Sequence, residues 1–132
     1  MTKKEIRDKQ FESIYSEAHE AGMIAGKGIN PKPMILGTPT SLISNDIDNT
    51  KPIYCVPDGP CGFAEVVVKP ATQPFAKWLK EAKGCTLHYY GGMSIWVSGF
   101  NQSMTRKEAY AEAFAKVLSK YNIKARTESR MD

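Results

Sequence analysis

The stretch of sequence that decides the fold is GFAEVVVKPATQPFAKWLKEAKGCTLHYYGGMSIWVSGF, residues 62–100. The alternation of apolar residues at its start predicts a strand over residues 63–69. An amphipathic helix follows, with Thr72 as its N-cap and Gly84 as its stop signal. The apolar face of that helix is formed by Phe75, Trp78, Leu79 and Ala82.

Two strands, 86–90 and 93–98, come next around Gly91-Gly92, a pair that can take the positive φ angles of a tight hairpin. A second amphipathic helix leads into a last strand over residues 124–130, and we expect a capping box of Thr105 with Glu108 at its start. The order strand, helix, strand, strand, helix, strand predicts an α+β fold with a ferredoxin-like βαββαβ core. Both apolar helix stripes must be buried, and both crossovers can return across one face of the sheet.

Two segments precede this core in what we interpret as a single domain, residues 1–132. In residues 1–28, apolar residues at three- and four-residue spacing predict a long helix that begins after Thr2. Residues 29–61 hold six of the eight prolines and are interpreted as a proline-rich wrapping segment with short strands at 34–36 and 53–56. Pairing of the strand at 53–56 with residues 63–68 is a competing topology.

The composition is that of a soluble globular protein. Of the 132 residues, 42% are hydrophobic and 24% are charged, which excludes collagen-like, coiled-coil and wholly disordered chains. The sequence has no apolar run near the ~18 residues that cross a bilayer, and its start lacks the apolar core of a signal peptide. We therefore expect a cytosolic protein. The net charge of +4 permits an anionic partner without requiring one.

Cysteine and histidine spacing argues against a metal or cofactor. The three cysteines form no CxxC pair, and the two histidines lie far apart, so we expect no metal site and no cofactor. A thiol mechanism needs a base, and Cys85 with His88 is the nearest combination. Neighbouring residues on one strand rarely point toward each other, so a buried or idle cysteine is the simpler interpretation. We expect a protein that is not an enzyme.

The sheet face that points away from the two helices gives the clearest hint of function. Aromatic side chains on central strands beside a basic edge strand are what RNA-binding sheets use to stack bases. The simpler interpretation is that the N-terminal helix and the proline-rich segment cover this face, or that two copies of the chain pair through it. The side chains that alternation places there are Phe63, Glu65, Val67, Lys69, Ser94, Trp96, Ser98, Lys124, Arg126, Glu128 and Arg130.

The segment before the second core helix is the other candidate contact. A helix N-terminus exposes free amide donors that attract anions. Here Ser103, Thr105, Arg106 and Lys107 surround one such terminus, and Asn101 and Gln102 precede it in the same candidate segment. An elaborate helix cap, with Met104 packed against Ala109, is the alternative interpretation.

These residues also carry a resemblance. The ending NQSMTRKEAYAEAFAKVLSKYNIKARTESRMD (101–132), with CGFAEVVVKPATQPFAKWL (61–79) and GGMSIWVSGF (91–100), resembles small uncharacterised proteins encoded by tailed bacteriophages. HEAG (19–22) and PKPMILGTPT (31–40) extend the likeness through most of the chain. It implies a viral origin and a location in the cytoplasm of the bacterial host, and it brings no established activity or catalytic residue. Small accessory phage proteins of this kind often block a host or defence protein or sequester a signalling nucleotide.

The sequence therefore predicts a non-catalytic, phage-encoded accessory binding protein that interferes with a host process, with anti-phage defence as the expected target. Its expected partner is a host protein or a nucleotide-type ligand, without a membrane, and a homodimer stays open. A single-stranded nucleic-acid-binding protein and a cysteine-dependent enzyme are the alternatives. The expected contact residues are Trp96, Asn101, Gln102, Ser103, Arg106, Lys107, Arg126 and Arg130.

Overall fold

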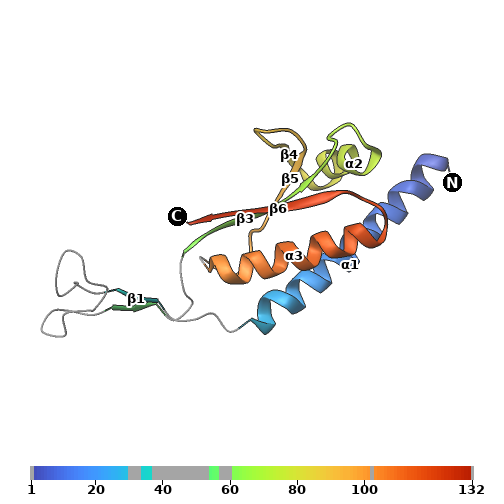
Figure 1. The fold of residues 1–132 in the computed structure, drawn as a ribbon. Helices are drawn as coiled ribbons and strands as arrows, with labels where there is room; N and C mark the ends of the chain where they lie inside the picture. The colour runs from blue at the N-terminus through green and yellow to red at the C-terminus, as the bar shows by residue number, and fades with distance from the viewer. Residues whose placement is uncertain (1, 30–33, 37–53, 57–60, 102, 132) are drawn as a thin grey trace, which may run out of the picture.

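Helices and a four-stranded antiparallel sheet form the α+β fold shown in Figure 1. The computed structural model describes residues 2–29, 34–36, 54–56, 61–101 and 103–131. In chain order the elements are α1 (Lys3–Gly28), β1 (Met34–Leu36), β2 (Tyr54–Val56), β3 (Gly62–Val68), α2 (Pro74–Lys83), β4 (Thr86–Leu87), β5 (Met93–Trp96), α3 (Met104–Lys120) and β6 (Ala125–Met131).

The strands of the main sheet lie in the order β4-β5-β3-β6, and each neighbouring pair is antiparallel. The central strand β3 places Glu65 directly opposite Trp96 of β5 on one side and Glu128 of β6 on the other. The competing topology is wrong, because β2 pairs with β1 in a separate two-stranded sheet. The rest of the expected proline-rich wrap lies largely outside the described residues.

The hydrophobic core lies between the sheet and the helices, as the alternation predicted. The inner faces of β3 and β5 meet the apolar stripes of α2 and α3, which removes these side chains from water. Fully buried aromatic rings from both helices, Phe75 and Phe114, belong to this core. Its residues from β3 and β5 are Ala64, Val66, Val68, Met93 and Ile95, and Val97 follows directly after β5.

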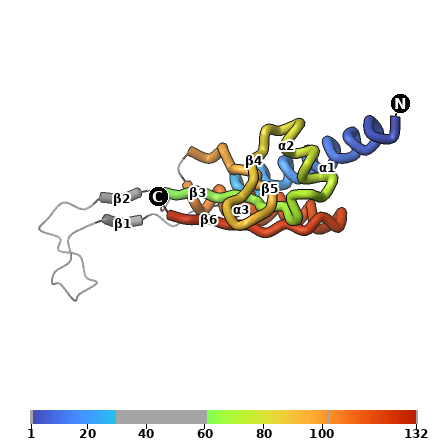
Figure 2. The backbone as a smooth tube through the Cα atoms, turned by 90° about the horizontal axis from the view of Figure 1, so that it is seen from above, coloured from blue at the N-terminus to red at the C-terminus, as the bar shows by residue number. Residues whose placement is uncertain are grey.

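Helix α1 packs on the helical layer, so the expectation that it covers the outer face of the sheet is wrong. In Figure 1, α3 lies between α1 and the sheet, and in Figure 2 the N-terminal turns of α1 project beyond the other elements. The reason is that aromatic rings of α2 and α3 in the core need cover from a second side, which α1 supplies. Phe11 contacts Phe75 of α2 at 5.3 Å between ring centroids, and Tyr15 contacts Phe114 of α3 at 5.4 Å.

Several helix ends differ from the prediction. Thr2 caps α1 as expected, because its hydroxyl accepts a hydrogen bond from the backbone N–H of Glu5. The expected caps of the other two helices are wrong. Gln73 is the N-cap of α2, because Pro74 already occupies the first helical turn, and Ser103 is the N-cap of α3. Gly84 ends α2 with a φ of 67°, as predicted.

Candidate ligand-binding groove

The outer face of the sheet, opposite the helices, carries a groove of about 970 Å³, which we call the outer groove. The described residues that line it come from the four strands and from the turn that joins β4 to β5. Trp96 is 51% exposed, so its ring is accessible from the groove. The lining residues are Phe63, Ala64, Glu65, Thr86, Leu87, His88, Tyr89, Tyr90, Ser94, Trp96, Thr127, Glu128, Ser129 and Arg130.

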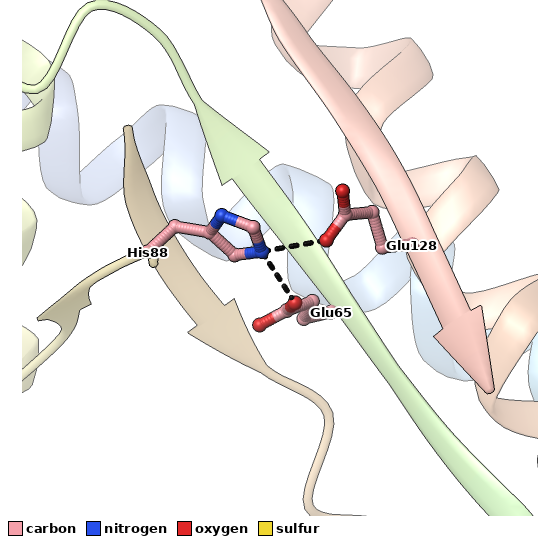
Figure 3. A group of neighbouring side chains, drawn as sticks. All are labelled: Glu65, His88 and Glu128. Atoms are coloured by element: carbon pink, nitrogen blue, oxygen red, sulfur yellow. Dashed lines mark ion pairs between the residues drawn. The ribbon is translucent and has the colours of Figure 1, made fainter. Parts of the chain in front are cut away.

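Glu65, His88 and Glu128 meet at the floor of this groove and form what we call the carboxylate–histidine cluster (Figure 3). The Nε2 atom of His88 lies 3.0 Å from Oε1 of Glu65 and 2.6 Å from Oε2 of Glu128. Two carboxylates directly opposite each other on neighbouring strands repel and destabilise a sheet. His88 offsets this repulsion because its Nε2 atom lies within hydrogen-bond distance of both.

Further donors hold the other oxygen of each carboxylate. The hydroxyl of Ser94 donates to Oε2 of Glu65. Arg126 donates from Nε and Nη2 to Oε1 of Glu128, at 3.3 Å and 3.0 Å. The Arg126 guanidinium, with a smaller contribution from His88, lowers the pKa of the Glu128 carboxyl, and partial desolvation opposes this effect. The cluster is therefore an ordered hydrogen-bonded network with donors on both carboxylates.

The turn between β4 and β5 carries His88 over the sheet. The backbone N–H of His88 donates to the carbonyl of Gly92, and the chain between them folds back over Val67. Gly92 has a φ of 96°, and a Cβ atom there would lie 2.6 Å from Cγ1 of Val67. This close approach explains why Val67 is buried although it points away from the helices.

The hydrogen bonds of His88 argue against a metal ion in the cluster. The ligand atoms of Glu65, His88 and Glu128 lie within 4.8 Å of one another, as a metal site would require. However, Nδ1 of His88 accepts a hydrogen bond from the backbone N–H of Tyr90 at 3.1 Å. A metal-bound histidine donates from its second ring nitrogen, whereas here Nε2 must carry the proton. The positive charge of Arg126 beside Glu128 also disfavours a cation.

Aromatic side chains form one end of the groove. The rings of Phe63 and Trp96 lie 5.4 Å apart between centroids with an interplanar angle of 38°. The guanidinium of Arg130, directly opposite Phe63 on β6, lies 5.7 Å from the Phe63 ring centroid. Tyr89 and Tyr90, which are 90% and 76% exposed, form the other wall on the hairpin turn. A flat apolar ligand would therefore meet accessible aromatic rings on either side of a polar floor.

The structure separates the predicted contact residues into two groups. Trp96 and Arg130 line the groove, and Arg126 holds Glu128 at its floor. Asn101 lies in the exposed turn before α3 with a φ of 52°, and Gln102 lies outside the described residues.

The remaining three predicted residues make contacts inside the fold. Ser103 caps α3, and Arg106 donates to the carbonyls of Gly26 and Lys27 at the end of α1. Lys107 is buried, and its Nζ atom donates to the carbonyl of Gly62. These contacts support the helix-cap interpretation of this segment, and an anion site there stays a prediction.

Cys61 and Cys85 are free cysteines. Burial raises the pKa of the Cys85 thiol, which disfavours the reactive thiolate. Cys61 is exposed. His88, the expected base, directs Nε2 to the two carboxylates.

Sequence reasoning missed the carboxylate–histidine cluster, although it placed Glu65 and Glu128 on the correct face. The signal that could have found it is the pair of acidic residues at the same level of two neighbouring strands. Such a pair requires a compensating donor. That His88 supplies this donor depends on the path of the hairpin turn.

No protein-family model, curated protein or solved structure matches this chain. The fold and the groove by themselves define an α+β protein with an accessible sheet face that is partly aromatic and partly polar. Among the described residues, none of the helices combines the length and apolar character needed to cross a bilayer.

Proposed function

We propose that this chain is a non-catalytic binding protein that holds a nucleotide-type ligand in the outer groove. The single observation that carries this proposal is that α1 packs on the helical layer instead of the outer face, where Trp96 stays accessible in a groove of about 970 Å³. A volume of this size suits a small molecule of nucleotide dimensions.

The arrangement of side chains supports a ligand with a flat ring and a negative charge. Trp96 offers an accessible ring on which a base can stack, and Phe63 lies beside it. Arg130 is exposed beside them and can pair with a phosphate. The aromatic surface and the guanidinium lie close together in the groove, so one nucleotide could contact the first with its base and the second with its phosphate.

The alternative of a single-stranded nucleic-acid-binding protein uses the same face. A continuous polyanion needs a basic path along the strands. The middle of this face instead holds two carboxylates, Glu65 and Glu128, and Arg126 is engaged with the second of them. This charge pattern favours a single nucleotide over a strand that crosses the whole sheet.

We further propose that the chain is phage-encoded and acts in the cytoplasm of a bacterial host, where it sequesters its ligand or blocks a host defence protein. The resemblance to small phage proteins supports this part. Two experiments test this part. The protein is purified from a bacterial host and denatured, and the released ligands are identified by mass spectrometry. Host proteins that bind it are captured by pull-down from host lysate. Recovery of neither a bound ligand nor a host protein would count against it.

We also propose that the sheet with α2 and α3 is a ferredoxin-like core. The order β4-β5-β3-β6, with the first core strand between the third and the fourth, supports this arrangement.

Trp96 provides a direct assay of the binding proposal. The other tryptophan, Trp78, is buried, so base stacking in the groove is expected to quench mainly the emission of Trp96. We expect a mixture of the four ribonucleoside monophosphates to quench emission saturably. Isothermal titration calorimetry should show binding to Trp96→Ala that is weaker by about fivefold or more, with partial retention in Trp96→Phe, because base–aromatic stacking contributes about 1–3 kcal/mol.

The matched control is Ile24→Ala, which changes an exposed apolar residue on α1, away from the groove. It should bind like the wild-type protein. Absence of saturable binding by the wild-type protein would contradict the proposed function. Salt-sensitive binding of single-stranded oligonucleotides without binding of mononucleotides would favour the nucleic-acid alternative.

A further inference from the structure

The floor of the outer groove offers hydrogen-bond acceptors, and this determines which base fits. A carboxylate has about four acceptor positions. Within the described residues, Glu65 accepts from His88 and Ser94, whereas Glu128 accepts from His88 and twice from Arg126. Glu65 therefore keeps more acceptor capacity for a ligand than Glu128 does.

Glu65 also lies beside the stacking surface. It is directly opposite Trp96 in the β3–β5 register, and Phe63, two residues earlier on β3, lies on the same face. Side chains directly opposite each other in an antiparallel pair have Cβ atoms about 5 Å apart. A base stacked on Trp96 can therefore reach Glu65 with its edge.

We infer that the outer groove selects guanine nucleotides, with Glu65 accepting the two donors of the guanine edge. This inference rests on the proposed function. Guanine presents N1–H and the N2 amino group side by side, and a carboxylate accepts from both. Adenine and cytosine present an acceptor beside their amino group, and uracil presents a donor between two acceptors. Each of these places an acceptor against Glu65, which is unfavourable.

Arg130 is placed to bind the phosphate end of the ligand. It faces Phe63 across β3 and β6, one step of two residues from Glu65, which corresponds to about 7 Å along the strand. Arg130 is an exposed residue, and a guanidinium can form paired hydrogen bonds with a phosphate. The groove thus places a carboxylate for the base beside Trp96 and a guanidinium for the phosphate beside Phe63.

Calorimetric titration of the wild-type protein with guanosine, inosine, adenosine, cytidine and uridine 5′-monophosphates tests the inference. Inosine lacks only the N2 amino group, so this comparison requires no variant. We expect guanosine monophosphate to bind at least tenfold more tightly than the other four, because a hydrogen bond to a charged group contributes about 1.5–3 kcal/mol.

The variant Glu65→Gln should lose this preference, because an amide presents one acceptor and one donor group. Binding of adenosine monophosphate should become tighter, because the amide group can donate to the adenine acceptor that the carboxylate opposes. Circular dichroism establishes that the variant is folded, which matters because Glu65 also accepts from Ser94 and His88. Glu20→Gln, at an exposed position on α1, is the matched control and should keep the preference.

The outcomes separate the two proposals. Equal affinity for guanosine and inosine monophosphates, or for all five nucleotides, would overturn guanine selection and leave the binding proposal intact. Absence of binding by all five would overturn both. Retention of guanosine preference in folded Glu65→Gln would show that another group reads the base and would overturn the role of Glu65.

Discussion

Glu65 lies directly opposite Glu128 on adjacent strands, and His88 reaches over the sheet from the β4–β5 hairpin to contact both carboxylates. The contact joins the β4–β5 turn to β3 and β6, although β5 lies between β4 and those two strands. The cluster thereby fixes the hairpin turn, with its two exposed tyrosines, in place above the groove.

Removing His88 is expected to destabilise the fold. His88→Ala leaves two facing carboxylates without their shared donor, and we expect the free energy of unfolding to fall by about 1–3 kcal/mol. Urea denaturation followed by circular dichroism measures this, with the exposed-residue variant Lys116→Ala as the control. Adding Glu128→Gln to His88→Ala should restore part of the loss, because it removes one of the two charges. A further loss in the double variant would contradict the repulsion argument.

The Glu128 carboxyl should contribute a specific acid sensitivity. Its pKa in the folded protein lies below its ordinary value of 4.5, chiefly because of Arg126. Its stabilising contribution is therefore fully present above that ordinary value and is lost as the pH falls through the lowered pKa. Arg126→Gln should reduce the loss of stability on acidification below pH ~5.

Urea midpoints measured across this pH range for the two proteins test that expectation. Glu17 also has a lowered pKa, through its hydrogen bonds to Lys120 and Tyr121, but it is unchanged in both proteins and cancels in the comparison. Identical pH dependence in the wild type and in Arg126→Gln would refute the assigned cause.

Gly91 and Gly92 form a matched pair that tests how closely the hairpin turn lies on the sheet. Both have positive φ angles, 94° and 96°, but only a Cβ atom at Gly92 meets the sheet, 2.6 Å from Val67. We expect Gly91→Ala to cost about 1–2 kcal/mol of stability from its backbone conformation. Gly92→Ala should cost about 2–5 kcal/mol, since overpacking adds to the same backbone cost. Equal thermal stability of the two variants would show that the turn does not press on Val67.

Gly22 tests the position of α1 on α3. A Cβ atom at this position would lie 2.6 Å from the ring of Tyr110, which is buried and whose hydroxyl lies 2.6 Å from Nδ1 of His19. Alanine is favoured over glycine in a helix by up to about 1 kcal/mol, but overpacking costs about 1–3 kcal/mol. Gly22→Ala should therefore lose about 1–2 kcal/mol in chemical denaturation.

The control for this substitution is Gly28→Ala, where a Cβ atom would meet nothing within 4 Å. This variant should be neutral or slightly stabilised. A stabilised Gly22→Ala would mean that α1 does not pack closely on α3 in solution.

Much of the fold could be predicted from local patterns, because helix periodicity and strand alternation act over neighbouring residues. The helices and the main strands lie where these patterns placed them, and the inner and outer faces of β3 and β5 were assigned correctly. The surface on which α1 packs could not be predicted. Its apolar stripe shows that it is buried, but the choice between the outer face and the helical layer depends on the shape of both surfaces.

The candidate site, too, was predictable only where local patterns determine it. Alternation placed Trp96 and Arg130 on the outer face, where they line the groove. The cluster required the pairing register and the backbone path through the 88–92 turn, which are properties of the whole sheet. The segment before α3 was predicted as a contact from its residue types alone. The partners of Arg106 and Lys107, the carbonyls of Gly26 and Gly62, come from parts of the chain distant in sequence.

The location of ligand binding is the central claim, and amide chemical-shift mapping tests it most directly. In a ¹H–¹⁵N correlation spectrum of this chain of 132 residues, addition of guanosine 5′-monophosphate should shift the outer-groove amides, including those of Phe63, Glu65, Trp96 and Arg130. The amides of α1 should be unaffected. Shifts concentrated at residues 101–107, or absence of any shift at saturating nucleotide, would contradict the assignment of the outer groove as the binding site.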